Sequence, residues 1–291
     1  MLRIDPHTHS RCSDGTDTPL ELLRLAREQG LDVIGATDHD TFDHWEEFRA
    51  AHQELSVSAA NPPAVILGTE ISSNFDHTPI HLLAYLSDPE RGALRALLSN
   101  VVRDRTARLK AMTEKISRDY PLSWDEVLAR VKGLTPGRPH LADALVARGY
   151  FPDRSAAFQI LGPDAPYYVR RPPVDTLEVI EATVSDGGVA VLAHPFSSTR
   201  HPHRLHPDSV RRLAQAGLAG IEVWHREHDA AQRQLAQDLA SELGLFTSGS
   251  SDYHGRGKPN RLGENLMPPK SFHTLVQRGA IGLLGELPSR T

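Results

Sequence analysis

Short apolar strands alternate with helical segments along most of the chain, and histidine or acidic residues follow several of the strands. The apolar stretch at residues 31–37 leads into Asp38 and His39, and the stretch at residues 189–193 leads into His194. Alternation of strand and helix favours a parallel α/β arrangement over a sandwich. In a parallel barrel the carboxyl ends of the strands open on one face. Side chains about 250 positions apart in sequence are therefore expected to meet there.

The number of strands narrows the fold further. Strands are expected at residues 2–4, 31–37, 64–70, 80–86, 189–195, 218–224 and 245–252. The helix between the first two has clear signals, with Thr18 as N-cap, Pro19 in the first turn, Glu21 completing a capping box and Gly30 ending it. About seven strands suit a (β/α) barrel slightly short of eight, and an open doubly wound sheet is the alternative.

A long middle segment departs from this alternation. Residues 88–173 contain only helical patterns, at 90–116, 123–131, 138–149 and 153–161, with no apolar strand between them. The sequence therefore predicts a barrel built from residues 1–87 and 174–291, interrupted by a helical insertion at residues 88–173.

Histidine and carboxylate side chains stand at the strand ends in a pattern suited to metal ions. His7 and His9 are two positions apart in extended chain, so both point to the same side, and Asp252 and His254 repeat that spacing. Nitrogen and oxygen donors without thiolate suit Zn, Mn or Fe. The complete set is His7, His9, Asp38, His39, Glu70, His81, His194, Asp252 and His254. So many donors exceed the needs of one ion, which predicts two or three ions, with Glu70 placed to bridge.

Each of these motifs has a structural alternative when taken alone. Asp38 in "TDHD" is expected either to orient the imidazole of a ligand histidine or to cap a helix, and the "AHP" around His194 is a common turn before proline. The metal hypothesis depends on the joint pattern, because purely structural roles do not place the same residue types at one strand end after another.

Composition excludes several classes of function. The net charge of -5 excludes a large duplex-DNA surface and leaves room for a local phosphate-binding patch. No run of residues approaches 18 apolar positions, so a soluble, cytoplasmic protein without membrane contacts is expected. Cys12 is the only cysteine, which excludes an internal disulfide framework and a cysteine-based zinc cluster.

The motifs in order are "DPHTHSRCSDG", "ATDHDT", "GTEIS", "IHLLAYL", "LAHPF" and "GSSDYHG". Together they resemble the PHP (polymerase and histidinol phosphatase) superfamily. "GRPHLADALVARGY" and "AGIEVWH" further resemble its stand-alone phosphoesterases that act on nucleotides. The similarity runs from Ile4 to about Gly263, with the insertion included.

This resemblance implies a distorted (β/α)7 barrel whose C-terminal face holds a trinuclear metal site under a helical lid. The first ion would be held by His7, His9, Glu70 and Asp252. Glu70 would bridge to a second ion held by His81 and His194, and the third would use Asp14, His39 and His254. Some family members have histidine at the position of Asp14, and a carboxylate there favours harder ions such as Mn²⁺.

The activity implied is hydrolysis of a phosphate ester by a metal-bridging hydroxide. Glu70, His194, Asp252 and His254 would act as the ligands that activate the water. The expected substrate is a 3',5'-nucleoside bisphosphate or a nucleoside monophosphate. The alternatives are 5'-to-3' trimming of short 5'-phosphorylated RNA, hydrolysis of histidinol phosphate and, from another class, a non-catalytic metal or nucleotide sensor.

Three further residues are candidates for contacting the substrate phosphate. Arg138 is the first of them, since a guanidinium matches phosphate in bidentate fashion, and His140 and His225 are the others. A solvated charge at a helix start is the alternative for Arg138. His44 and His52 are expected on the surface, and His201, His203 and His206 in a solvated loop.

Overall fold

A computed structural model describes residues 1–58, 62–131, 133, 135–172, 174–197 and 205–287, and shows a seven-stranded sheet in which neighbouring strands follow the chain order. The strands are β1 (Ile4–Asp5), β2 (Val33–Ala36), β3 (Ala64–Phe75), β4 (Thr78–Tyr85), β5 (Val189–Ala193), β6 (Gly220–Trp224) and β7 (Phe246–Gly249). The seven strands were all expected from the sequence, with β3 extending five residues beyond the expected end at Glu70.

The expected parallel arrangement is wrong at one strand. β4 runs antiparallel to both β3 and β5, whereas the remaining neighbours pair in parallel. The reason is a tight turn at Asp76 and His77, both with positive φ, which leaves no chain for a crossover. Because β4 is reversed, its beginning, and with it His81, lies at the end of the barrel where the other strands finish.

The two edges of the sheet come together beyond β1 and β7. Thr8 pairs with Tyr253 in an isolated parallel bridge, and the amide of His9 donates to the carbonyl of Tyr253 (2.8 Å). The sheet is therefore a nearly closed, distorted seven-stranded barrel. The expected (β/α)7 fold is confirmed, and the open doubly wound sheet is wrong.

Side chains of each strand alternate between two hydrophobic layers, as the pleat requires. On β4, Leu82 and Ala84 pack outward in the cluster that contains the surrounding helices, while Leu83 and Tyr85 pack in a second cluster inside the barrel. The inner cluster is completed by Phe272 and Leu275, which close the end of the barrel near Leu86. The opposite end is left to polar side chains.

Ten α-helices cover the sheet or form the insertion, within the described part of the chain. α1 (Pro19–Glu28) has the expected capping box between Thr18 and Glu21. The other helices around the barrel are α2 (His44–Ser58), α7 (Thr176–Ser185), α8 (Pro207–Gln215), α9 (Ala230–Leu243) and α10 (Pro269–Arg278). α10 contains His273, which lies in a helical pattern in the sequence, and Pro269 occupies its first turn. No helix among the described residues is long and apolar enough to cross a membrane.

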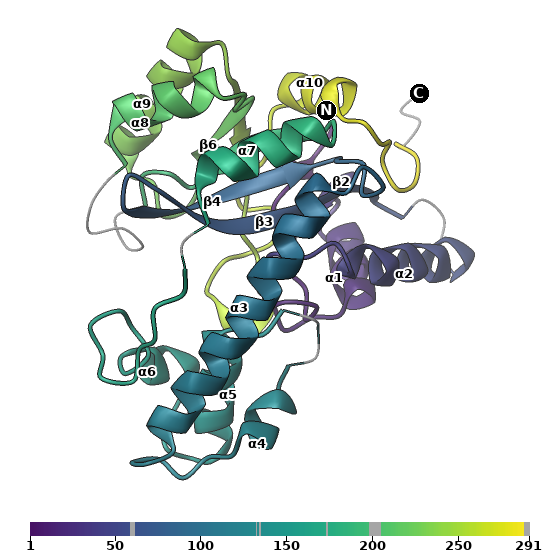
Figure 1. The fold of residues 1–291 in the computed structure, drawn as a ribbon. Coiled ribbons are helices and arrows are strands. Elements are labelled where there is room, and N and C mark those ends of the chain that lie inside the picture. Colours follow the sequence, from purple (N-terminus) through teal and green to yellow (C-terminus); the bar gives the residue numbers. More distant parts are fainter. Residues whose placement is uncertain (59–61, 132, 134, 173, 198–204, 288–291) are drawn as a thin grey trace.

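The helical insertion forms a lobe on the side of the barrel away from α10 (Figure 1). It comprises α3 (Ala93–Ile116), α4 (Trp124–Leu128), α5 (Arg138–Ala147) and α6 (Arg154–Phe158). The first half of α3 packs in the outer barrel cluster through Leu94 and Leu98, and its second half packs in a separate cluster with α4, α5 and α6. This separate cluster supports our proposal that residues 88–173 form a subdomain.

Several minor histidines differ from expectation. His44 and His52 are buried rather than on the surface, and the ring of His44 bonds to the carbonyl of Ala36 (3.1 Å). His206 is exposed and caps α8, in keeping with a solvated position. His201 and His203 lie outside the described residues.

The close approach of the backbones of β1 and β2 allows their register to be tested by substitution. A Cβ atom at Gly35 would lie 1.5 Å from the carbonyl oxygen of Pro6, directly before His7. Gly35→Ala should therefore destabilise the protein by about 3 kcal/mol, at the upper end of overpacking effects. Urea unfolding measures this, with Gly282→Ala as the control because a Cβ there meets nothing within 4 Å. Equal stability of the two variants would contradict the register of β1 on β2.

Candidate metal centre

Nine histidine and carboxylate side chains gather at the polar end of the barrel in three overlapping groups. Within each group the possible ligand atoms lie within 4.8 Å of one another. The groups are His7, His9, Glu70 and Asp252; Glu70, His81 and His194; and His9, Asp14, His39 and His254. The nine residues are those that the resemblance to the PHP superfamily implied as metal ligands, with Asp14 included and Asp38 absent. Their assignment as ligands is part of our proposal below.

The first group lies at the ends of β1 and β7, against β3. Nε2 of His9 is 3.0 Å from Oε2 of Glu70 and 3.3 Å from Oδ1 of Asp252. Nε2 of His7 is 3.2 Å from the same Glu70 oxygen. All four side chains are fully buried. Four donors thus converge on one small volume.

The second group uses the other oxygen of the same glutamate. Oε1 of Glu70 is 2.6 Å from Nδ1 of His81 and 3.0 Å from Nε2 of His194. Since Oε2 faces the first group and Oε1 the second, Glu70 has the geometry of a bridging carboxylate. The reversed direction of β4 is what brings His81 to this place.

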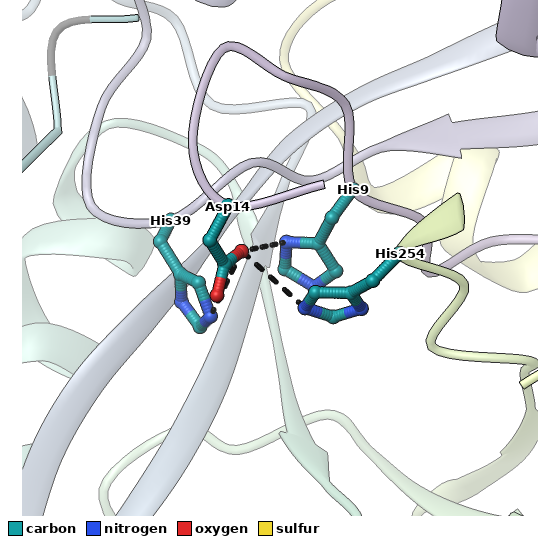
Figure 2. A group of neighbouring side chains, drawn as sticks. All are labelled: His9, Asp14, His39 and His254. Atoms are coloured by element: carbon teal, nitrogen blue, oxygen red, sulfur yellow. Dashed lines mark ion pairs between the residues drawn. The ribbon is translucent and has the colours of Figure 1, made fainter. Parts of the chain in front are cut away.

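Figure 2 shows the third group, in which three imidazole rings surround Asp14. Oδ1 of Asp14 is 3.3 Å from Nε2 of His254, 3.8 Å from Nδ1 of His9 and 3.9 Å from Nε2 of His39. The presence of His9 in this group was not expected from the sequence. Its two ring nitrogens face different groups, so His9 links the first and the third.

The chemistry of these donors fits divalent cations. Oε2 of Glu70 and Nε2 of His254 are buried, with facing imidazole or carboxylate atoms at 3.0 to 3.4 Å but no well-aligned hydrogen bond among the described residues. Burial acts to raise the pKa of the Glu70 carboxyl, but the adjacent His81 and His7 hold it well below its usual range. An ionised, buried carboxylate surrounded by imidazole nitrogens is a set that Zn²⁺, Mn²⁺ or Fe²⁺ accepts.

Two of these residues have unusual backbone conformations. His194 and Asp252 have φ values of 27° and 52°, which residues other than glycine rarely adopt. Such conformations cost free energy and persist where surrounding structure imposes them, often at functional sites. Here each occurs just beyond a strand end, where the chain turns a side chain toward the barrel axis.

Glu222 on β6 supports the centre and was not identified from the sequence. Its fully buried carboxylate contacts Nδ1 of His7 (3.0 Å) and accepts hydrogen bonds from the amide of His194 (2.8 Å) and the hydroxyl of Ser250 (2.5 Å). Partnering Nδ1 directs Nε2 of His7 toward the first group. The available signal was a single acid within the apolar strand "GIEVW".

Asp38 has a role different from both expectations, which were orientation of an imidazole and capping of a helix. Its carboxylate accepts hydrogen bonds from the amides and hydroxyls of Ser10 and Ser13, at 2.6 to 3.0 Å. It therefore fixes the loop that carries Asp14.

The three predicted phosphate contacts occupy different places. Arg138 lies in the insertion, and its Nη1 donates to the carbonyl of Leu161 (3.2 Å). His140 is buried, accepts a hydrogen bond from the amide of Gly137 (3.1 Å) and contacts the backbone of Ser13.

His225 lies behind Asp252 rather than at the surface of the centre. It is fully buried, with Nε2 3.6 Å from Oδ2 of Asp252, and its Nδ1 accepts from the amide of Glu227 (3.2 Å). In this structure the ring of His225 contacts the carboxylate of Asp252 and supports it. A direct contact of His225 with substrate remains a prediction.

Comparison with known proteins agrees with this geometry. The family model described as PHP domain matches residues 5–132. A 5'-3' exoribonuclease of Haemophilus influenzae is 30% identical over 91% of this chain and 94% of its own length. A 3',5'-nucleoside bisphosphate phosphatase of Chromobacterium violaceum is 28% identical over 90% of each chain.

A solved structure extends the similarity to the whole fold. A protein of Bifidobacterium adolescentis, described as a metal-dependent phosphoesterase, superimposes with a TM-score of 0.90 and is 38% identical. The match covers 96% of this chain and 97% of that one, so the helical insertion is included.

The contacts of Glu222 generate a test of the centre. Glu222→Ala removes the partner of His7 and leaves the amide of His194 without an acceptor, so metal affinity should fall about 10- to 100-fold. Metal analysis after dialysis against a graded chelator measures this. Glu242→Ala, at an exposed ion pair with Arg211, is the matched control. Wild-type metal retention in Glu222→Ala would show that the hydrogen bond to His7 is dispensable.

Proposed function

The chain belongs to the PHP domain family, and we propose that it removes the 3'-phosphate from a 3',5'-nucleoside bisphosphate. It is a metal-dependent phosphoric ester hydrolase, like the relatives described above. The choice of substrate is our inference, and it rests on a group of arginines beside the metal centre.

The three ligand groups are proposed to hold two or three Mn, Fe or Zn ions. Bound there, such ions lower the pKa of water and neutralise the oxygens of the phosphoryl group under attack. The protein contributes the buried donors themselves and their supports. Glu70 would bridge the first two ions, and Asp14, unlike a histidine, would favour a hard ion such as Mn²⁺ at the third.

Four arginines of the insertion form a group that we call the arginine cluster: Arg105, Arg108, Arg138 and Arg171. Arg105 pairs with Asp40 (Nε–Oδ2 2.5 Å) and donates to the hydroxyl of Ser72 (3.0 Å). Arg171 donates to the carbonyl of the same Ser72 (3.0 Å). The guanidinium groups of Arg108 and Arg138 both lie over the ring of Tyr168, at 4.8 and 5.8 Å from its centre.

This cluster adjoins the metal centre. Asp40, the partner of Arg105, follows His39 directly in sequence. Ser72, which contacts two of the arginines, pairs with His81 in the ladder between β3 and β4. The cluster therefore borders the second and third ligand groups.

The arginine cluster has unused capacity to bind an anion. Nη2 of Arg108 and Nη1 of Arg171 are buried and have no hydrogen-bond partner among the described residues. Burial and the neighbouring Arg138 lower the pKa of Arg108 to about 10. Burial lowers the pKa of Arg171 too, and Arg105 adds to that effect against the opposing charge of Asp40. A phosphate would supply acceptors for both nitrogens and offset this repulsion.

A second anion site implies a substrate with two phosphates. One phosphoryl group would lie at the ions and the other at the arginine cluster. A 3',5'-nucleoside bisphosphate fills both sites with its 3'- and 5'-phosphates. A nucleoside monophosphate or histidinol phosphate fills one, and a non-catalytic sensor does not explain the complete set of ligand groups.

Trimming of 5'-phosphorylated RNA is the second candidate, because it places the same two groups in the same sites. A cavity of about 570 Å³ favours it, since room is needed for the rest of the strand. The cavity is lined by residues of the loops after β6 and β7, including Arg226, Lys258 and Asn260. Lys258 also reaches Asp252 (Nζ–Oδ2 3.3 Å), so the cavity adjoins the first ligand group.

The role of the arginine cluster is tested by comparing two substrates. Arg108→Met should lower kcat/KM for adenosine 3',5'-bisphosphate roughly 30-fold, the effect of losing about 2 kcal/mol of charged hydrogen bonding. Hydrolysis of 3'-AMP, which lacks the 5'-phosphate, should not change. Arg130→Met, an exposed arginine of the same insertion, is the control. An equal loss on both substrates would overturn the assignment of this subsite.

The metal-dependent chemistry is tested by removal of a proposed ligand. His194→Ala should abolish phosphate release with Mn²⁺, Fe²⁺ or Zn²⁺ and reduce the metal bound per chain, because the second group then retains only Glu70 and His81. Short 5'-phosphorylated RNA would release mononucleotides instead of inorganic phosphate, so separating the products of the two substrates distinguishes the two candidates. If neither the bisphosphate nor the RNA is turned over by the wild-type protein, the proposed substrates are wrong.

A further inference from the structure

One arginine of the insertion reaches the loop that carries Asp14, and we propose that this residue, Arg154, positions Asp14 and thereby sets the affinity of the third metal site. This inference rests on the proposed metal centre. It differs from the role of the arginine cluster, because each of the three guanidinium nitrogens of Arg154 donates a hydrogen bond within the protein.

Arg154 is held rigidly at the start of α6 by a carboxylate of α5. Nε donates to Oδ1 of Asp143 (2.8 Å), and Nη2 donates to Oδ2 of the same residue (2.7 Å). The side chain of Arg154 is 19% exposed. Bidentate pairing fixes the plane of a guanidinium as well as its position, so the remaining nitrogen, Nη1, points in one defined direction.

Nη1 of Arg154 donates to the backbone carbonyl of Asp14 (3.1 Å), 140 residues away in sequence. The same nitrogen lies against Gly257, where a Cβ atom would be only 2.6 Å from it. Gly257 comes three residues after His254, and its amide bonds to the carbonyl of His254 (3.3 Å). Arg154 therefore lies between the chain segments that supply Asp14 and His254 to the third ligand group.

Asp14 depends on such support more than the other carboxylates of the centre. Glu70 lies in a strand and is fully buried, whereas Asp14 lies in the loop between β1 and α1 and is 17% exposed. Asp38 holds this loop from the barrel side, through Ser10 and Ser13. Arg154 holds it from the insertion side.

Two further contacts bring the insertion onto the same loop. His140 on α5 contacts the backbone of Ser13. Gly133 packs so closely that a Cβ atom there would lie 1.7 Å from the carbonyl oxygen of Cys12. The loop of Asp14 is thus enclosed between barrel and insertion, and Arg154 contributes the contact to the ligand residue itself.

Hydrogen exchange of the metal-free protein tests the positioning role directly. The amides of Ser13 and Gly15 bond to the carbonyl of Ser10, and that of Thr16 to the carbonyl of His254, so their exchange reports on the loop. Arg154→Met should increase exchange at residues 13–16 roughly 10-fold and leave the strands unchanged. Asp143→Ala, which releases Arg154 from its partner, should act in the same direction. Arg148→Met, at an exposed ion pair with Glu126 in the same insertion, is the control.

Titration with Mn²⁺ alone then tests the consequence for the metal site. Arg154→Met should weaken the third equivalent of Mn²⁺ about 10- to 100-fold, the usual effect of losing a contact that orients a ligand, and leave the other two unchanged. A general folding defect would instead weaken all equivalents and lower the melting temperature.

The outcomes separate this inference from the proposed function. Unchanged exchange and unchanged Mn²⁺ binding in Arg154→Met overturn the role of Arg154 alone. If the wild-type protein binds fewer than three Mn²⁺ ions, the proposed third metal site is wrong, and with it the influence of Arg154 on that site. Increased exchange at residues 13–16 without any change in the third equivalent of Mn²⁺ would show a structural contact with no influence on the metal site, and would likewise overturn the proposal.

Discussion

The burial of ionisable groups at one end of the barrel is the constraint on which the rest of the structure depends. Glu70, Asp252, His7, His9 and His194 have fully buried side chains. Ionised groups in such a setting are costly unless opposite charges or metal ions compensate them. Most of the imidazole nitrogens face carboxylate oxygens, which offsets this cost, while Nε2 of His7 and Nε2 of His9 face each other at 3.1 Å. Such a set of converging donors is also what divalent ions need.

The barrel can hold these groups because the sheet and additional side-chain contacts fix the segments that carry them. His7, at the end of β1, is held by the strand and by Glu222, which also binds the amide of His194. His81 reaches the centre only because β4 is reversed. The inner hydrophobic layer, closed by α10, fills the other end of the barrel and leaves this one to polar groups.

Local signals in the sequence were sufficient for most elements and for eight of the nine candidate ligands, whereas Asp14 was identified only through the family resemblance. The capping box of α1 and the apolar strands are properties of neighbouring residues, and the ligands follow strand ends. The direction of β4 was not predictable, because its turn at Asp76 and His77 lacks the glycine that marks a tight hairpin. The partners of Glu222, and the meeting of Arg105, Arg108, Arg138 and Arg171, depend on contacts between distant segments and have no local signature.

The insertion carries both the residues that we propose to recognise the substrate and a residue that contacts the metal centre. It carries all four clustered arginines, which border the second and third ligand groups, and it carries Arg154, which contacts Asp14. Its own hydrophobic cluster joins α3 to α6, so the helices that carry Arg108, Arg138 and Arg154 are packed as one body. An anion that draws Arg108 and Arg138 together would therefore act on the same body that supports Asp14. In this arrangement the element that we propose to select the substrate also holds the loop of Asp14, a candidate ligand of the third group.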